Sequence, residues 1–165
     1  MENVILVGMP GSGKSTIGVV LAKVLGYEFL DSDLVIQKQE KRKLSEIIAK
    51  EGTEGFLSIE NEVIKNLNVD QTVIATGGSA IYGAEGMEHL KEIGTVIYLK
   101  IDYEPLCRRL GNLKARGVVL KSGQTFQQLY DERVPLYEKY ADVVIDEKNK
   151  EIREIVDEIA EILLK

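Results

Sequence analysis

Short apolar runs and longer segments of helical periodicity alternate along the chain. The apolar runs are rich in β-branched residues and are expected as strands at 4–7, 27–30, 72–75, 95–99 and 143–145. Between them, apolar residues recur every three or four positions, as over 17–24 and 152–163. Apolar strands that alternate with amphipathic helices are typical of a parallel sheet covered on both faces. The pattern therefore predicts a three-layer α/β fold.

Breaks in this pattern predict where the helices end. Gly26 follows the first helical segment and is expected to end it. The segment 34–66 predicts helices interrupted at Gly52 and Gly55. The charged tail 147–165 is expected as the solvated face of a last helix. Neither a repeat nor a low-complexity linker divides the chain, so residues 1–165 are expected to form one domain.

The overall charge narrows the choice of partners. The 165 residues carry a formal net charge of −6, and the pI is about 5.0. Nucleic acids and membrane surfaces attract clustered Lys and Arg, so neither partner is expected, whereas a small anion needs only a few aimed cations. The chain shows no secretory signal, and no apolar run approaches the roughly 20 residues of a membrane helix. We expect a cytoplasmic protein.

The clearest chemical signal is a G-x-x-x-x-G-K-S motif at 8–15, between an expected strand and an expected helix. Its glycines let the backbone curl so that N–H groups surround phosphate oxygens, and the following helix presents its positive end to the same anion. In such a loop Lys14 reaches the β- and γ-phosphates and the Ser15 hydroxyl binds Mg²⁺. The predicted phosphate-binding residues are Gly11, Ser12, Gly13, Lys14, Ser15 and Thr16.

Signatures of other phosphate-binding-loop classes do not occur. A GTPase is expected to carry Asn-Lys-x-Asp for guanine, but Asn149-Lys150 is followed by Glu151-Ile152. A motor-type ATPase usually has an apolar strand that ends directly in Asp, whereas the third expected strand runs into Thr76-Gly77-Gly78. A kinase is therefore the favoured class.

Two carboxylates, Asp31 and Asp33, follow the second expected strand. Residues at i and i+2 of an extended chain point the same way, so both are expected to face the cleft beside the phosphate-binding loop. One carboxylate would serve Mg²⁺ through water, and the other would contact the acceptor hydroxyl. The alternative is that Ser32 or Asp33 only caps the next helix; the two roles are compatible.

The segment 111–124 breaks the periodicity with glycines and carries the positive charges of Lys114, Arg116 and Lys121. A basic loop between two helices of an α/β domain predicts a mobile lid over the site. The alternative is an ordinary solvated loop.

Together these residues resemble the shikimate kinase family, within the nucleoside-monophosphate-kinase-like P-loop proteins, along essentially the whole chain. Several motifs occur in the family's order, which makes the resemblance more specific than any single motif. The matching pieces are 11–18 with Leu21-Ala22, Phe29-Leu30-Asp31-Ser32-Asp33, Phe56 with Glu60, Ile74-Ala75-Thr76-Gly77-Gly78, Arg109 with Arg116, and Glu132-Arg133-Val134-Pro135-Leu136-Tyr137.

The resemblance implies a role for each of five residues. Asp33 matches the carboxylate that holds the acceptor hydroxyls and is the candidate base, and Asp31 matches the partner of the Mg²⁺-bound water. Arg133 matches the arginine that grips the substrate carboxylate. Arg116 matches the lid arginine that closes on the transferring phosphate, and Arg109 the arginine that packs against adenine.

The resemblance also implies the architecture and the reaction. It implies a five-stranded parallel sheet in the order 2-3-1-4-5, with a lid at about 111–124 and a substrate-binding helical segment at about 33–66. Gly77 and Gly78 match backbone contacts to the substrate. The reaction would be transfer of the γ-phosphate of ATP, with Mg²⁺, to shikimate, giving shikimate 3-phosphate. A monomer or weak homodimer with no other partner is expected.

The departures from the family pattern lie on the acceptor side. Leu57 stands where the family has a second carboxylate-binding arginine, Ser79 stands where it has a third glycine, and Gly117 follows Arg116 where it has proline. The predicted acceptor site consists of Asp33, Leu57, Gly77, Gly78, Ser79 and Arg133.

These departures leave more than one candidate for the acceptor molecule. It is shikimate, or another small hydroxy acid, polyol or hydroxy amino acid. A nucleotide-binding regulatory protein that has lost phosphate transfer is a third hypothesis. The presence of Asp33 and Arg116 argues against that hypothesis, because a sensor needs neither.

Overall fold

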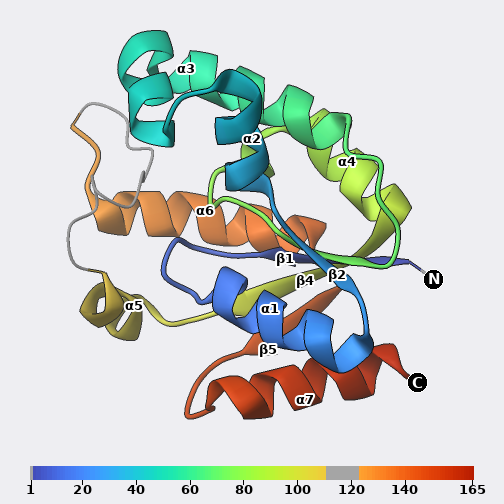
Figure 1. Ribbon diagram of the computed structural model, residues 1–165. Helices are drawn as coiled ribbons and strands as arrows, with labels where there is room; N and C mark the ends of the chain where they lie inside the picture. The colour runs from blue at the N-terminus through green and yellow to red at the C-terminus, as the bar shows by residue number, and fades with distance from the viewer. Residues whose placement is uncertain (1, 111–122) are drawn as a thin grey trace.

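The computed structural model describes residues 2–110 and 123–165. Its centre is a five-stranded sheet in the order β2-β3-β1-β4-β5, and every neighbouring pair is parallel. The predicted strand order and fold class are confirmed (Figure 1). The strands are β1 (Asn3–Val7), β2 (Glu28–Asp31), β3 (Thr72–Ala75), β4 (Gly94–Lys100) and β5 (Val143–Asp146).

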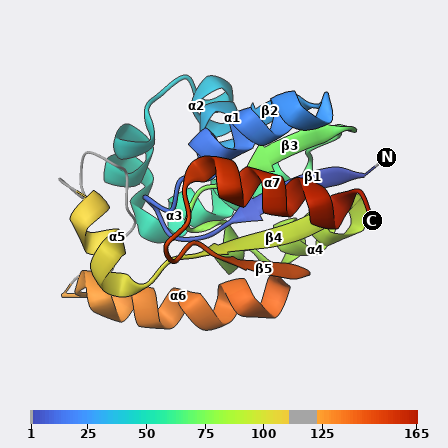
Figure 2. The ribbon, with the colours of Figure 1, turned by 90° about the horizontal axis from the view of Figure 1, so that it is seen from below.

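Helices cover both faces of the sheet. In Figures 1 and 2, α1 and α7 lie together on one face of the sheet, and α4 and α6 lie on the other, where α3 packs against both α2 and α4. The helices are α1 (Lys14–Leu25), α2 (Ser32–Glu40), α3 (Leu44–Lys65), the short 3-10 helix η1 (Ala80–Tyr82), α4 (Ala84–Ile93), α5 (Tyr103–Arg109), α6 (Phe126–Tyr140) and α7 (Ile152–Leu163).

The alternation of side chains along the strands separates two cores. In β1, Val4 and Leu6 point toward α1 and α7, whereas Ile5 and Val7 point toward α3, α4 and α6. All four side chains are buried. A central parallel strand must be apolar on both faces, which is why β1 reads as a continuous hydrophobic run.

Most element boundaries fall within a residue or two of the sequence-based prediction. Gly26 ends α1 in a left-handed conformation at φ 74°, as its position predicted. For α4 the sequence predicted only a helical stretch around His89, without bounds. Five of its ten residues are Gly, Glu or Lys, so its apolar positions are few.

The segment 34–66 is interrupted, but only partly where predicted. The chain breaks between α2 and α3 at Lys41, which adopts φ 57° without a glycine. Ion pairs of Arg42 with Glu40 and Glu51 tie this corner together. Gly52 kinks α3 at φ 77°, as predicted, whereas no break occurs at Gly55. The two ion pairs of Arg42 join side chains two and nine residues apart, which apolar periodicity does not register.

The topology places a crevice at the carboxyl edge of the sheet. The chain leaves β1 toward β2 and β3 on one side, and later crosses to β4 and β5 on the other. In open parallel sheets ligands bind outside the carboxyl ends of the strands, where the winding changes direction. The segments that follow β1, β2 and β3 meet there.

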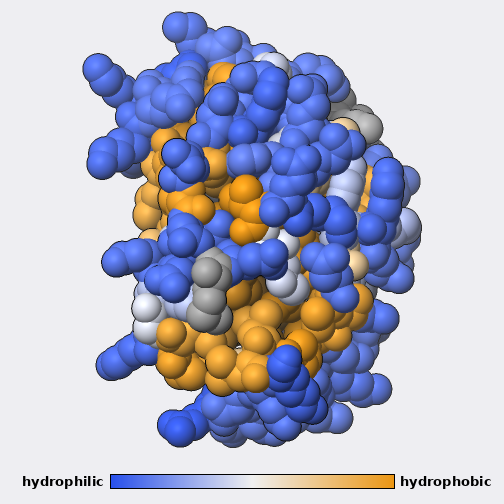
Figure 3. All heavy atoms as spheres, turned by 90° about the vertical axis from the view of Figure 1, so that its right-hand side faces the viewer, coloured by the Kyte–Doolittle hydropathy of each residue, from blue (hydrophilic) through white to orange (hydrophobic). Residues whose placement is uncertain are grey.

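The opposite edge of the sheet carries both termini (Figure 1). Figure 3 shows this face, and apolar side chains gather over its lower part, where α1 and α7 lie. A shallow hollow there is lined in part by Leu25, Leu163 and Leu164. Among the described helices, none is both long and apolar enough to span a bilayer.

Candidate active site

The loop between β1 and α1 has the backbone that its glycines predict. Gly13 caps α1 in a left-handed conformation at φ 94°, and Gly11 has φ 86°. A Cβ on Gly11 would also lie 2.8 Å from Cδ2 of Leu110. Both positions therefore require glycine, and the start of α1 supplies unpaired N–H groups and a positive helix end for an anion.

Lys14 folds back across this loop. Its Nζ donates hydrogen bonds to the carbonyl oxygens of Gly8 at 2.7 Å and Met9 at 2.9 Å, and the residue is only 8% exposed. Burial lowers the pKa of Lys14 to about 8, while Asp33 partly opposes this shift. A phosphate placed against the loop would restore the full charge of the ammonium group.

Asp31 joins β2 to α2 and faces the loop. Its Oδ1 accepts hydrogen bonds from the backbone N–H groups of Asp33 at 2.9 Å and Leu34 at 3.4 Å, so Asp31 is the N-cap of α2. Its Oδ2 accepts from the hydroxyl of Ser15 at 3.1 Å. The cap is therefore neither Ser32 nor Asp33, the two residues considered from the sequence.

Asp33 lies in the first turn of α2, not in extended chain. The i, i+2 argument from the sequence was therefore wrong in its geometry, although both carboxylates do line the same cleft. Burial raises the pKa of Asp33 to about 6; the charge of Asp31 adds to this shift, and Lys14 opposes it. The helix start, rather than strand alternation, turns both side chains toward the loop.

The turn after β3 forms the floor of the acceptor side. A Cβ on Gly78 would lie 2.8 Å from Cδ of Pro10 and 2.9 Å from Nη1 of Arg133, so the turn accommodates no side chain there. The carbonyl oxygen of Gly78 accepts a 2.6 Å hydrogen bond from the hydroxyl of Tyr137. The next residue, Ser79, is buried and lines the cleft.

Arg133 projects from α6 into this cleft and is only 1% exposed. Its Nε donates to the hydroxyl of Tyr82 at 3.4 Å, and its guanidinium lies 5.4 Å from the centre of the Tyr82 ring. The Tyr82 hydroxyl in turn donates to Glu132. A buried guanidinium at the wall of a cleft is suited to bind a carboxylate through two parallel hydrogen bonds.

These elements enclose a cleft of ≈ 330 Å³. Its walls combine residues of the phosphate-binding loop, the start of α2, the turn after β3 and α6. Such a volume suits a small metabolite beside a phosphate group. The predicted residues that line it are Gly11, Gly13, Lys14, Ser15, Thr16, Asp31, Asp33, Gly77, Gly78, Ser79 and Arg133.

Other predicted residues lie elsewhere. Ser12 belongs to the phosphate-binding loop but is fully buried and does not line the described cleft. Leu57 is half-buried against the small apolar cluster of α2 and α3. It does not belong to the described residues that line the cleft. Arg116 and residues 111–122 of the predicted lid fall outside the described part of the chain.

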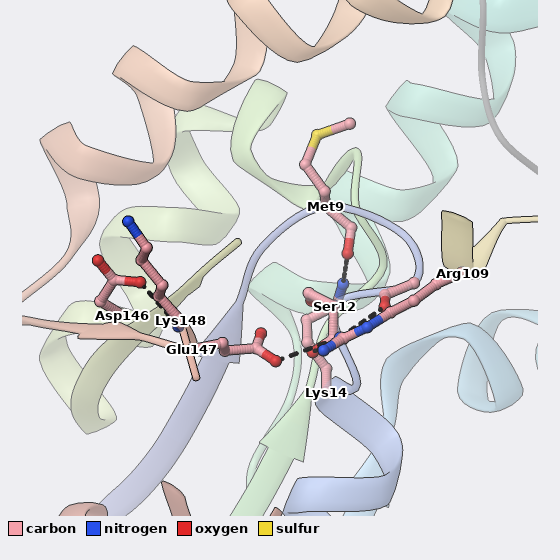
Figure 4. Close-up of polar contacts among 8 residues, drawn as sticks. Met9, Ser12, Lys14, Arg109, Asp146, Glu147 and Lys148 are labelled. Carbon is pink, nitrogen blue, oxygen red and sulfur yellow. Dashed lines mark hydrogen bonds and ion pairs between the residues drawn. The ribbon is translucent and has the colours of Figure 1, made fainter. Parts of the chain in front are cut away.

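Arg109 lies on the outer side of the phosphate-binding loop (Figure 4). Its Nη1 donates to the carbonyl oxygen of Gly11 at 3.3 Å and forms an ion pair with Oε1 of Glu147 at 3.2 Å. Figure 4 shows the Glu147 carboxylate pointing at this guanidinium. The predicted contact of Arg109 with adenine stays a prediction.

Sequence reasoning missed Glu147 and Glu60. It placed Glu147 in a solvated tail, but the residue is 5% exposed, and burial raises the pKa of its carboxyl against the effect of Arg109. Glu147 directly follows β5, so the strand-end rule that found Asp31 could have found it. Glu60 was noted only as a matching motif residue; it is 2% exposed and bonded to Ser79.

The fold and this cleft define a P-loop kinase-type α/β protein. Comparisons with known proteins agree. The sequence model of the shikimate kinase family matches residues 10–164. Over 160 residues the chain is 34% identical to the shikimate kinase of Bacillus mycoides, with 96% of each chain covered. It is 36% identical to that of Persephonella marina, covering 96% of this chain and 97% of the relative.

Solved structures give the same result. Shikimate kinase from Acinetobacter baumannii in complex with shikimate superposes with a TM-score of 0.85 at 32% identity, covering 99% of this chain and 93% of that one. Shikimate kinase from Aquifex aeolicus superposes with a TM-score of 0.83, also at 32% identity, over 98% and 95% of the two chains. The chain described here belongs to the shikimate kinase family.

Proposed function

We propose that this protein transfers the γ-phosphate of ATP to a hydroxyl group of shikimate. The observation that carries the proposal is the convergence of Lys14, Asp33 and Arg133 on one cleft, from α1, α2 and α6. These residues supply a cation for the transferred phosphate, an acceptor for a hydroxyl proton and a partner for a carboxylate. The Acinetobacter baumannii relative, whose structure contains shikimate, supports the choice of acceptor.

On the nucleotide side, the loop backbone and Lys14 would bind the phosphates. The N–H groups at the start of α1 and the Lys14 ammonium both belong to this loop, and together they would stabilise the charge of the transferred phosphoryl group. The hydrogen bonds of Lys14 to the carbonyl oxygens of Gly8 and Met9 hold the ammonium beside the loop before substrate arrives. By the family resemblance, we assign Arg109 to packing against the adenine and Arg116 to binding the transferred phosphate.

Mg²⁺ would fit beside Ser15 and Asp31. Their hydroxyl and carboxylate oxygens lie 3.1 Å apart and face the cleft, and oxygen is the donor this cation prefers. The described residues contain no cluster of three acidic, His or Cys side chains, so phosphate and water oxygens would complete the shell. When bound, the ion would neutralise charge on the phosphates.

On the acceptor side, Asp33 would accept a hydrogen bond from the attacking hydroxyl and take up its proton. Its pKa, raised to about 6 by burial, leaves the carboxyl ionised at neutral pH and makes it more basic than a solvated aspartate. Arg133, buried opposite, would orient the substrate through its carboxylate. The rigid Gly77-Gly78 turn between them would set the distance between hydroxyl and phosphate.

A different acceptor is the second candidate. Leu57 and Ser79 depart from the family pattern, and the described cleft offers one arginine, Arg133, among its lining residues. A hydroxy acid with a single carboxylate, a polyol or a hydroxy amino acid would also meet Asp33 and Arg133. We also infer a cytoplasmic enzyme that acts as a monomer or weak homodimer on small molecules.

The test is a steady-state assay of the purified protein with ATP, Mg²⁺ and shikimate, with ATP hydrolysis in the absence of shikimate as background. Shikimate-dependent ADP release is expected. If turnover does not exceed background while ATP still binds, shikimate is not the acceptor. A thermal-shift screen of hydroxy acids and polyols with ADP and Mg²⁺ would then identify the acceptor, because a ligand that binds only the folded state raises its stability.

A further inference from the structure

Glu60 is a buried carboxyl group for which the reaction described above has no use. It lies on α3, 2% exposed, directly behind the acceptor side of the cleft. Its Oε1 accepts a 2.7 Å hydrogen bond from the hydroxyl of Ser79, whereas its Oε2 is buried and has no hydrogen-bond partner among residues 2–110 and 123–165. An ionised carboxylate with one oxygen orphaned in the protein interior is strongly unfavourable.

The Oε2 atom of Glu60 and the carboxylate of Asp33 both adjoin Gly77. A Cβ on Gly77 would lie 3.0 Å from Oε2 of Glu60 and 2.5 Å from Oδ1 of Asp33, so the two carboxyl groups border the same edge of that glycine. Two negative charges that border the same small volume in a buried site repel each other, and one of the groups is expected to keep its proton.

The other groups around Glu60 indicate which carboxyl keeps it. Burial raises the pKa of Glu60 to about 8, and the charge of Asp33 adds to this effect; the Ser79 hydrogen bond and the charge of Arg133 oppose it. The buried Tyr137 hydroxyl lies on the same side. Lys14 lowers the pKa of Asp33 and has no such effect on Glu60. The proton therefore belongs on Glu60.

The chain's two departures beside Glu60 agree with this assignment. Leu57 lies three residues earlier on α3, on the same side of the helix, and is packed with apolar side chains rather than presenting a cation. Ser79 adds a hydroxyl that donates to Oε1. A cation removed and a neutral donor added are both changes that suit an uncharged acid.

We propose that Glu60 works as an uncharged carboxylic acid, held by Ser79 through Oε1 and carrying its proton on Oε2 toward Asp33. Glu60 is then a positioning residue: of the described groups that border Gly77, Asp33 alone carries a negative charge, and the Oε2 proton is available to fix the orientation of its carboxylate. The rate measurement below rests on the proposed kinase function, whereas the measurement of the proton does not.

The direct test uses carbon-13 NMR of the wild-type chain labelled at the glutamate carboxyl carbons. One resonance is expected to keep the chemical shift of a protonated acid at pH 7, to move only at alkaline pH, and to disappear in Glu60→Gln. Should that variant fail to fold, Ser79→Ala identifies the resonance by shifting it. The proposal is overturned if every glutamate titrates in the acidic range, or if the persistent resonance belongs to Glu147 alone.

The kinetic test compares Glu60→Gln with Glu60→Leu, using Glu62→Gln on the exposed face of α3 as the control. Glutamine keeps one acceptor for Ser79 and one donor toward Asp33, so kcat and KM are expected to stay within about threefold of the wild type. Leucine keeps the volume but neither hydrogen bond, and kcat is expected to fall about tenfold or more. If Glu60→Gln is as damaging as Glu60→Leu, the charge is needed and the proposal fails.

Discussion

The hydroxyl of Tyr137 donates a 2.6 Å hydrogen bond to the carbonyl oxygen of Gly78 and lies 3.7 Å from the sulfur of Met9. It therefore connects α6, which carries Arg133, to the turn after β3 and to the phosphate-binding loop. The Tyr137 ring is fully buried and stacks on Tyr98 with 5.2 Å between ring centres. The Tyr137 side chain thus contacts both the acceptor side of the cleft, at Gly78, and the phosphate-binding loop, at Met9.

Tyr137→Phe is expected to keep the fold and loosen this connection. The ring stacking remains, but the hydrogen bond to Gly78 is lost, which costs about 1 kcal/mol. We expect KM for the acceptor to rise about fivefold with a smaller change in KM for ATP. Steady-state kinetics check this, with Tyr140→Phe on the same helix as the control. Equal changes in both KM values would contradict a role confined to the acceptor turn.

Lys14→Ala is expected to abolish transfer without unfolding the protein. The buried ammonium has a lowered pKa, so its removal relieves a desolvation cost while deleting the charge that stabilises the transferred phosphate. Phosphate transfer should fall about 100-fold or more, and the melting temperature should not fall. Lys23→Ala, exposed on the same helix, serves as the control. Retained transfer would remove Lys14 from the mechanism.

Asp33→Asn separates acceptor chemistry from nucleotide binding. The amide keeps the size of the side chain but accepts no proton, so kcat with the acceptor is expected to drop about 100-fold or more. Binding of ADP, measured by calorimetry, should change little because the loop and Lys14 remain. The exposed Asp70→Asn is the control. An unchanged kcat would leave the kinase hypothesis without its acceptor site.

Leu57→Arg tests whether the rest of the acceptor site follows the family pattern. Leu57 packs beside the cleft rather than in its described lining, so the test is whether the longer arginine side chain reaches a substrate carboxylate, where a hydrogen bond is worth about 1.5–3 kcal/mol. Affinity for shikimate, measured by calorimetry with ADP present, should then rise about tenfold or more. Weaker binding would mean that the pocket is built for another acceptor. Ile59→Arg, a half-buried residue on the same helix, is the matched control.

The stability of the protein is expected to depend on pH through Glu60. The folded protein holds this proton up to a pKa of about 8, whereas the unfolded chain releases it near 4.5. The free energy of unfolding should therefore fall as pH rises from about 5 to 8, by at most ~1.4 kcal/mol per pH unit. Glu60→Gln should lack this slope. Denaturant titrations of both proteins at several pH values check it, and parallel slopes would contradict the raised pKa.

Much of the fold follows from local patterns. The alternation of apolar runs and helical segments predicted the α/β class, because a parallel sheet buried on both faces requires uniformly apolar strands such as β1. The break at Lys41 escaped prediction, and α4 was expected only as a helical stretch around His89. The Lys41 break carries no glycine, and α2 and α4 both pack against α3. The strand order came from the family resemblance and not from periodicity.

The sequence by itself determined the phosphate-binding loop, because its glycines and Lys14 act through the backbone of one continuous segment. Only the tertiary structure decided which distant groups share a proton, a charge or a bond. It bonded Ser15 to Asp31, buried Glu147 against Arg109 and joined Ser79 to Glu60. Burial and charge spacing depend on residues far apart in the chain, and those spatial relations set the pKa values and the shape of the acceptor site.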